Sequence, residues 1–95
     1  MTIKHKALER LFAAKPGAAV KGLDPLAAKK IRRMVAVLEA SDHPNELRND
    51  HPGWNVHELT PGSPGKWALN VTANYRLTFK LEGKEIFDLD FEDYH

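Results

Sequence analysis

Two histidines, an arginine and a tyrosine in the C-terminal half of the chain are of the types that cleave phosphodiester bonds. His57 and Arg76 lie in segments rich in apolar residues, and the sequence ends with Asp93, Tyr94 and His95. Cleavage of RNA by its own 2′-OH needs a base, a cation that stabilises the phosphorane, and an acid for the leaving 5′-oxygen. Histidine can do either proton transfer near neutral pH, and arginine offers phosphate a planar fork of donors. Together these residues suit phosphodiester chemistry on RNA.

Alternating apolar and polar residues predict the strands that would carry these side chains. We expect strands at 54–59, 67–72, 75–81 and 85–91, with tight turns between them. Hairpin links between consecutive strands predict a small, mainly antiparallel, twisted sheet with one apolar face. In the last strand the alternation places three residues on the apolar face, namely Phe87, Leu89 and Phe91.

The polar face of this sheet would gather the candidate catalytic side chains. If Val56 faces the core, His57 points to the other side, and Arg76 points there from the third strand. The same face would also receive Thr78, Lys80, Asp88 and Asp90. The C-terminal tail leaves the last strand and can fold over this face. The alternation thus predicts one site made of the polar face and the tail.

Each candidate residue also has a structural explanation. His57 could be an ordinary surface histidine, and Arg76 could pair with Asp88 or Asp90 across neighbouring strands. The last two residues could be a core aromatic and a frayed end. Periodicity alone therefore supports a small α+β domain with a possible affinity for nucleic acid.

Two amphipathic helices are expected before the sheet, and they supply the cover that its apolar face needs. Residues 5–14 carry apolar side chains at helical spacing and end at Pro16-Gly17. A second helix begins at Asp24-Pro25, an N-cap carboxylate followed by proline at the first helical position. It ends at residues 41–44, and we expect a loop over residues 42–53. The predicted fold is therefore α+β, with two N-terminal helices on one face of the sheet.

Length and composition limit what this chain can be. Its 95 residues predict a single domain spanning 1–95, with 42% apolar and 28% charged residues, as is usual for a globular protein. The absence of cysteine excludes disulfides and thiolate metal sites, and no histidine–carboxylate spacing predicts another metal site or a cofactor. No segment resembles a membrane span or a signal peptide, so we expect a cytoplasmic protein with no membrane partner.

Charge is unevenly distributed along the chain although its net value is only +1. The first 48 residues are rich in lysine and arginine, whereas the last 14 contain six acidic residues. This asymmetry permits a basic surface for a polyanion. The residues that we expect to bind RNA or the ribosome are Lys29, Lys30, Arg32, Arg33, Lys66 and Lys80. The four in the second helix could equally form only a solvated helix face.

Three segments of the chain resemble HigB-type killer proteins of the RelE/ParE superfamily. The opening 5–12, His-Lys-Ala-Leu-Glu-Arg-Leu-Phe, is similar to the family's KHKGLERL. Residues 65–71 and 74–79 resemble its G-x-W-s-i-x-V and N-W-R-I-T-F motifs, and residues 88–95 resemble its D-v-D-Y-E-D-Y-H terminus. The matches keep the family's order and extend over almost the whole chain.

The resemblance implies a RelE-like toxin that enters the ribosomal A site and cleaves mRNA there. It also implies neutralisation by a HigA-like helix-turn-helix antitoxin, with operator DNA contacted only through that antitoxin. The family's catalytic positions fall on His57, Arg76, Asp93, Tyr94 and His95. No metal or cofactor is implied.

One family position differs in this sequence. Thr60 stands where the family has a lysine three residues after the strand histidine, and Pro61 and Pro64 alter the following turn. This difference favours an alternative, a catalytically weakened binding module that acts with its antitoxin as a corepressor. A third hypothesis, a sheet-based RNA-binding domain without an antitoxin, is disfavoured because the polar strands lack paired aromatic residues.

Overall fold

All helical segments precede the strands along the described chain. The computed structural model describes residues 1–60, 62 and 64–93. Its helical segments are α1 (Lys6–Ala13), α2 (Pro25–Ala40), the 3₁₀ turn η1 (Pro44–Glu46), α3 (Leu47–Asp50) and the 3₁₀ turn η2 (Pro52–Trp54). Its strands are β1 (His57–Glu58), β2 (Lys66–Asn70), β3 (Tyr75–Glu82) and β4 (Glu85–Asp93).

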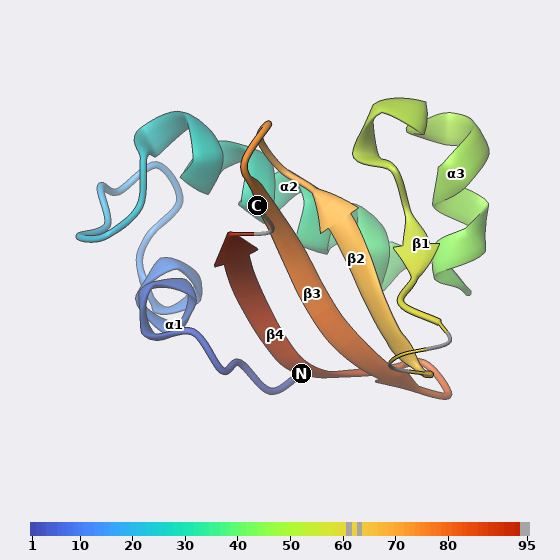
Figure 1. The fold of residues 1–95 in the computed structure, drawn as a ribbon. Coiled ribbons are helices and arrows are strands. Elements are labelled where there is room, and N and C mark those ends of the chain that lie inside the picture. The colour runs from blue at the N-terminus through green and yellow to red at the C-terminus, as the bar shows by residue number, and fades with distance from the viewer. Residues whose placement is uncertain (61, 63, 94–95) are drawn as a thin grey trace.

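The four strands form one antiparallel sheet in the order β1-β2-β3-β4, and α2 lies behind it (Figure 1). The start of the chain runs beside β4, where Ile3 forms an isolated parallel bridge with Leu89. The predicted α+β fold, with helices on one face of a mainly antiparallel sheet, is therefore confirmed. The opposite face of the sheet, which we call the outer face, carries no helix from the described residues.

Side-chain caps fix where the two long helices begin. His5 Nδ1 accepts a hydrogen bond from the Ala7 amide at the start of α1. The Asp24 carboxylate accepts from the amides of Leu26 and Ala27, and Pro25 occupies the first turn of α2, as predicted. The helices contribute to a core whose fully buried members include Leu8, Leu11, Ile31, Met34, Leu69, Leu77, Phe79 and Leu89. None of the described helices is long and apolar enough to cross a membrane.

The loop predicted over residues 42–53 is wrong, because this segment forms η1, α3 and most of η2. Its prolines begin short helical turns at Pro44 and Pro52, where the missing amide is not needed. Leu47 and Trp54 from this segment are buried in the core. The described chain therefore has a third α-helix beyond the two expected.

The predicted strand 54–59 is also shorter in the structure, where β1 holds only His57 and Glu58. Trp54 belongs to η2, and Asn55 has a left-handed backbone with φ of 47°. Asparagine tolerates this conformation better than most residues, so it ends the helical turn and redirects the chain into β1.

A β-bulge in β4 reverses the alternation that the sequence suggested for its first half. Thr78 lies opposite Asp90, but Lys80 lies opposite Phe87, so β4 has one extra residue between these pairs. Asp88, with φ of 54°, takes up this extra residue. Phe87 therefore shares the outer face with Lys80, and its predicted place on the apolar face is wrong. Ile86 is buried in its place, whereas the predicted burial of Leu89 is confirmed.

Candidate active site

Strand register brings His57 and Arg76 to the outer face of the sheet. His57 lies opposite Ala68, which lies opposite Thr78, so these three residues form one row across β1, β2 and β3. Arg76 belongs to the next row, between Asn70 on β2 and a carboxylate of β4. His57 and Arg76 are two strands apart across the sheet and one row apart along it, which corresponds to about 12 Å between their Cα atoms. The imidazole of His57 and the guanidinium of Arg76 could both contact a phosphodiester bound between them.

Local backbone geometry fixes the protonation pattern of His57. Its Nδ1 lies 2.6 Å from the carbonyl oxygen of Asn55, which the left-handed backbone of that residue presents to the ring. A carbonyl can only accept a hydrogen bond, so Nδ1 carries the proton in the neutral ring. The lone pair is then on Nε2. His57 is thus prepared to accept a proton through Nε2.

The short helix α3 holds β1 in place from the side. Arg48 Nε donates a 3.0 Å hydrogen bond to the carbonyl of Val56, the residue before His57. The Arg48 guanidinium also lies over the ring of Trp67, 6.0 Å from its centroid. Val56 and Trp67 are both buried. The two-residue strand that carries His57 is therefore anchored on both its core side and its main chain.

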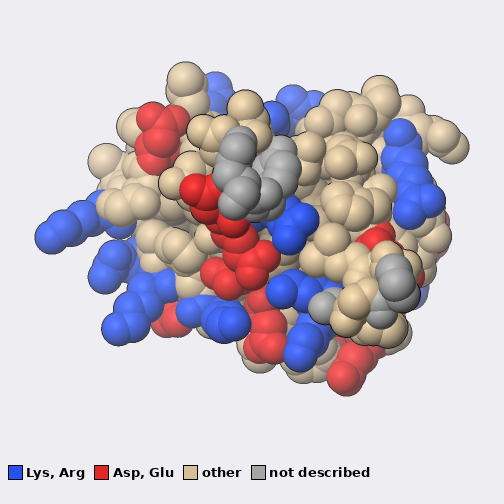
Figure 2. All heavy atoms as spheres, viewed as in Figure 1, with Lys and Arg blue, Asp and Glu red and all other residues tan. Residues whose placement is uncertain are grey.

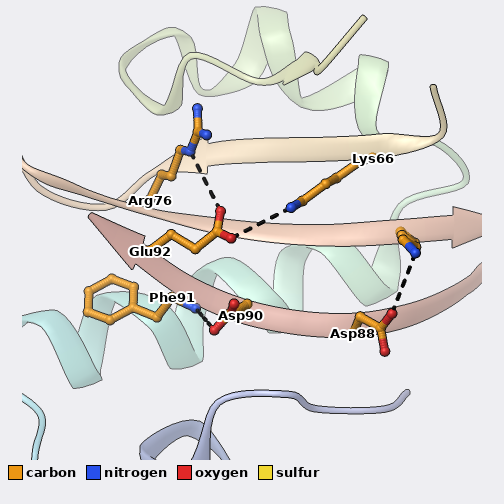
Figure 3. A network of polar contacts seen from close by, with 7 residues as sticks. Lys66, Arg76, Asp88, Asp90, Phe91 and Glu92 are labelled. Carbon is orange, nitrogen blue, oxygen red and sulfur yellow. Dashed lines mark hydrogen bonds and ion pairs between the residues drawn. The ribbon is translucent and has the colours of Figure 1, made fainter. Parts of the chain in front are cut away.

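Arg76 and Lys66 converge on a single carboxylate of the outer face. Glu92 lies directly opposite Arg76 in the sheet register. Its Oε2 lies 4.0 Å from Arg76 Nε, and its Oε1 lies 3.6 Å from Lys66 Nζ. Figure 3 shows the Glu92 carboxylate between the two cationic side chains. The alternative explanation for Arg76, an ion pair across neighbouring strands, is correct in kind, but the partner is Glu92 and neither Asp88 nor Asp90.

The other end of the outer face has a hollow of about 420 Å³ near Lys66 and Lys80. Lys80 Nζ lies 3.8 Å from Asp88 Oδ2 on β4, an ion pair also visible in Figure 3. Thr78, at the floor of the hollow, is completely buried, and its hydroxyl has no hydrogen-bond partner within the described part of the chain. Lys4 from the N-terminal segment also lines this hollow.

Acidic and basic side chains are interspersed over the outer face, as Figure 2 shows. The basic ones among the site residues are Lys66, Arg76 and Lys80, and β4 supplies Asp88, Asp90 and Glu92. The Asp90 carboxylate accepts a hydrogen bond from the amide of Phe91, 2.9 Å away. No group of three or more histidine, cysteine or acidic residues within residues 1–60, 62 and 64–93 is placed to hold a metal ion.

Of the C-terminal candidates the structure describes Asp93, the last residue of β4. Asp93 lies opposite Tyr75, so the pleat directs it to the face away from Arg76 and Glu92. Tyr94 and His95 lie outside the described residues. Tyr75 is 41% exposed and stacks on Phe91, with ring centroids 5.1 Å apart.

The basic residues predicted in the second helix lie on α2, which packs against the other face of the sheet. Lys30 Nζ donates to the carbonyl of Val71, and Arg32 donates to the carbonyls of Leu11 and Lys15. These two cations tie α2 to neighbouring segments. Lys29 and Arg33 are exposed. The structure therefore does not bring this basic group together with His57 and Arg76.

Glu92 is a candidate functional residue that alternation alone did not single out. It lies in the acidic end of the sequence, two residues after Asp90, and that spacing places both carboxylates on one face. Its pairing with Arg76 could not be read from the sequence, because the bulge at Asp88 sets the register of β4 against β3.

Comparisons with known proteins identify the family of this chain. The chain is 30% identical over 96 residues to a protein named Endoribonuclease HigB from Proteus vulgaris; the match covers 99% of this chain and 97% of that protein. All 95 residues, 1–95, match the family described as HigB-like toxin, the RelE-like toxin of the type II toxin–antitoxin system HigB. The chain therefore belongs to the HigB-like family of RelE-like toxins of type II toxin–antitoxin systems.

Proposed function

We propose that this toxin is a ribosome-dependent endoribonuclease that cleaves mRNA in the A site by acid–base chemistry of its own side chains, without a metal ion. The observation that carries the proposal is the placement of His57 and Arg76 on the one face of the sheet that no described helix covers. The similarity to the Proteus vulgaris endoribonuclease supports the same activity. Its site of action would be the cytoplasm, where ribosomes translate mRNA.

The proposed reaction is an attack of the ribose 2′-oxygen on the adjacent phosphorus. His57 Nε2 takes the 2′-OH proton, a role supported by the hydrogen bond that keeps the proton of the neutral ring on Nδ1. The new bond joins the 2′-oxygen to phosphorus, and the bond from phosphorus to the 5′-oxygen breaks. His95 gives its proton to that leaving oxygen. The products are a 2′,3′-cyclic phosphate and a 5′-hydroxyl, and water returns the two histidines to their starting protonation states.

The other candidate residues would stabilise and orient the reacting groups. Arg76 would donate to the phosphorane oxygens, where its charge matters most. Tyr94 would stack on a base or orient the nucleotide, and Asp93 would lead the chain from β4 into the catalytic tail. The ribosome would supply much of the substrate positioning, which explains why so few side chains suffice.

Contacts with the ribosome and the antitoxin form part of the same proposal. The exposed Lys29 and Arg33 would contact ribosomal RNA, together with Lys30 and Arg32 on α2. Lys66 and Lys80 would contact mRNA on the outer face. The partner that neutralises the toxin would be a HigA-like helix-turn-helix protein, and operator DNA would be bound only through it.

The test of this function is the variant His95→Ala, alongside a deletion of the last two residues. Induction of either variant is expected to leave growth unarrested, and primer extension should show no new mRNA ends at ribosomal A sites. Lys84→Ala is the control, because the ion pair that Lys84 forms with Asp42 is exposed. Undiminished toxicity of a folded His95→Ala protein would refute the proposed role of the tail.

A second candidate function is favoured by Thr60, the residue in place of the family lysine. It is exposed in the turn after β1 and brings no positive charge to the site. A toxin that lost cleavage could still act as a corepressor with its antitoxin. Operator binding by the antitoxin that strengthens when this protein is added, with no mRNA cleavage after induction, would favour this alternative.

A further inference from the structure

The outer face of the sheet has a charge balance that is unexpected for a surface that binds RNA. Lys66, Arg76 and Lys80 share this face with the three carboxylates Asp88, Asp90 and Glu92 of β4, and Lys4 lines the hollow at one end of it. A polyanion binds by replacing the counterions of cationic groups, so a face with internal counterions of its own has little net attraction for it. At least one of these ion pairs has to open when a phosphate binds.

Glu92 is the carboxylate best placed to be exchanged. It contacts two cations at once, Arg76 through Oε2 at 4.0 Å and Lys66 through Oε1 at 3.6 Å. The carboxylate of Asp90 is engaged with the Phe91 amide, and that of Asp88 faces Lys80 at the other end of the hollow. Figure 3 shows that Arg76 and Lys66 approach the Glu92 carboxylate from different sides. They come from β3 and β2, and Glu92 comes from β4.

We propose that Glu92 is a positioning residue whose carboxylate takes the place of a substrate phosphate between Arg76 and Lys66, and that a phosphodiester of single-stranded RNA displaces it. A carboxylate presents two anionic oxygens, as a phosphodiester does, and both oxygens are already matched to a cation here. The inference rests on the proposed function for the identity of the anion. In this proposal Lys66 and Arg76 bind the same phosphate of the RNA, and not two different phosphates.

The geometry of these ion pairs is suited to exchange. The side chains of Lys66, Arg76 and Glu92 are 30%, 25% and 30% exposed, so water and a ligand can reach part of each, although the Arg76 Nε atom itself is buried. The separations of 3.6 and 4.0 Å are long for ion pairs, and partly exposed pairs of this kind are weak. Phosphate can therefore compete with Glu92 through the exposed parts of the two cationic side chains.

In the free protein the same ion pairs, although weak, favour positions of the two cations close to Glu92. Lysine and arginine side chains lose much rotational freedom when they are ordered against a ligand. Because Glu92 already holds Lys66 and Arg76 over one point of the outer face, part of that cost is met before RNA arrives. Glu92 therefore has two opposing effects, since it orders the phosphate site and also competes for it.

The experiment compares the full-length protein with Glu92→Gln in binding a fluorescein-labelled, fully 2′-deoxy hexanucleotide, which cannot be cleaved through a 2′-OH. Loss of the competing charge is expected to tighten binding several-fold at low salt. The plot of log affinity against log salt concentration should become steeper by about 0.7 for each cation released, and so by up to about 1.4. A purely structural role of Glu92 would weaken binding or leave this slope unchanged.

The matched control is Glu82→Gln, which makes the same charge change at the opposite end of β3 from Arg76. It is expected to leave the slope at its wild-type value. Glu92→Asp keeps a competing carboxylate and should bind more weakly than Glu92→Gln. Binding by Glu92→Gln that is no tighter than binding by Glu82→Gln, with an unchanged slope, would overturn the inference.

A measurement on the unaltered protein keeps the inference testable if Glu92→Gln does not fold. The ¹⁵N resonance of Arg76 Nε should shift as the hexanucleotide is added, together with the ¹³C resonance of the Glu92 carboxylate. A shift of neither resonance at saturation overturns the inference. Because the probe cannot be cleaved, these results are independent of the proposed activity: failure of ribosomal mRNA cleavage alone would count against the function and not against the role of Glu92.

Discussion

The hydrogen-bonding pattern of the His57 ring is set by its immediate neighbours in the sequence. Asn55 adopts a left-handed backbone, and its carbonyl oxygen accepts a hydrogen bond from Nδ1 of the His57 ring. This contact joins the His57 ring to the main chain of the turn only two residues earlier, so it is set by local structure. In the proposed mechanism it leaves Nε2 as the base.

Thr60 provides a test at a single position. Replacing it with lysine is expected to raise the rate of mRNA cleavage about threefold to tenfold, because one additional cation near the reacting phosphate stabilises developing charge. Thr60 is exposed, so the change should leave stability within about 0.5 kcal/mol of the wild type. The rate is measured as kcat/KM on programmed ribosomes. Thr60→Met, which has similar length without the charge, is the control; equal rates for the two variants would contradict the expectation.

Among the elements, α3 contributes more to the site than its four residues suggest. It occupies a segment that composition predicts to be loop, but Leu47 packs into the core and Arg48 binds the main chain beside His57. A two-residue strand has few ladder hydrogen bonds of its own. The position of β1, and with it that of His57, therefore depends on this helix.

Arg48→Ala is expected to destabilise the protein by about 1–2 kcal/mol, because a charge-assisted hydrogen bond to the Val56 carbonyl is lost. It should also lower cleavage, since β1 is then free to shift. Urea denaturation measures the loss of stability, and the rate of mRNA cleavage in the absence of urea measures the loss of activity. Arg10→Ala, an exposed change in α1, should have little effect on either. A loss for Arg48→Ala no larger than for Arg10→Ala would exclude the anchoring role.

The bulge in β4 is the second element that shapes the site. Without the extra residue at Asp88, the later part of β4 would be out of step with β3, and Asp90 and Glu92 would point into the core. The Thr2 hydroxyl oxygen supports the bulge, because it accepts a 2.8 Å hydrogen bond from the Asp88 amide. The N-terminal segment thus helps to place Glu92 beside Arg76.

For the whole molecule, the sheet separates two groups of cations. Lys66, Arg76 and Lys80 lie on the outer face among carboxylates, whereas the basic residues of α2 lie beyond the core on the other face. In the proposed function the first group contacts the mRNA substrate and the second contacts the ribosome.

The double variant Lys29→Ala/Arg33→Ala tests this division. Its affinity for ribosomes is expected to fall several-fold, with a salt dependence less steep by about 0.9 for each lost phosphate contact, while binding of a free oligonucleotide stays unchanged. Sedimentation with ribosomes at several salt concentrations measures the effect. Lys6→Ala/Lys84→Ala removes the same charge from other exposed positions and is the control. Equal losses for both pairs would mean that only net charge matters.

Much of this architecture was predictable because it depends on local chemistry. The apolar spacing of the two long helices, the Asp24-Pro25 start and the alternation in β3 are confirmed by the structure. The placement of His57 and Arg76 on one face follows from the same two-residue period. The family motifs lie on these elements, so the type of toxin was recognisable from the residues themselves.

The sequence by itself determined the fold class, the two long helices and the side of the sheet on which His57 and Arg76 lie, because period and capping act over a few residues. Only the tertiary structure decided that residues 44–54 form helical turns and that Glu92 stands between Arg76 and Lys66. The first depends on burial of Leu47 and Trp54 against distant strands, and the second on a one-residue bulge at Asp88. Contacts between segments far apart in the chain set both, and a local pattern does not encode them.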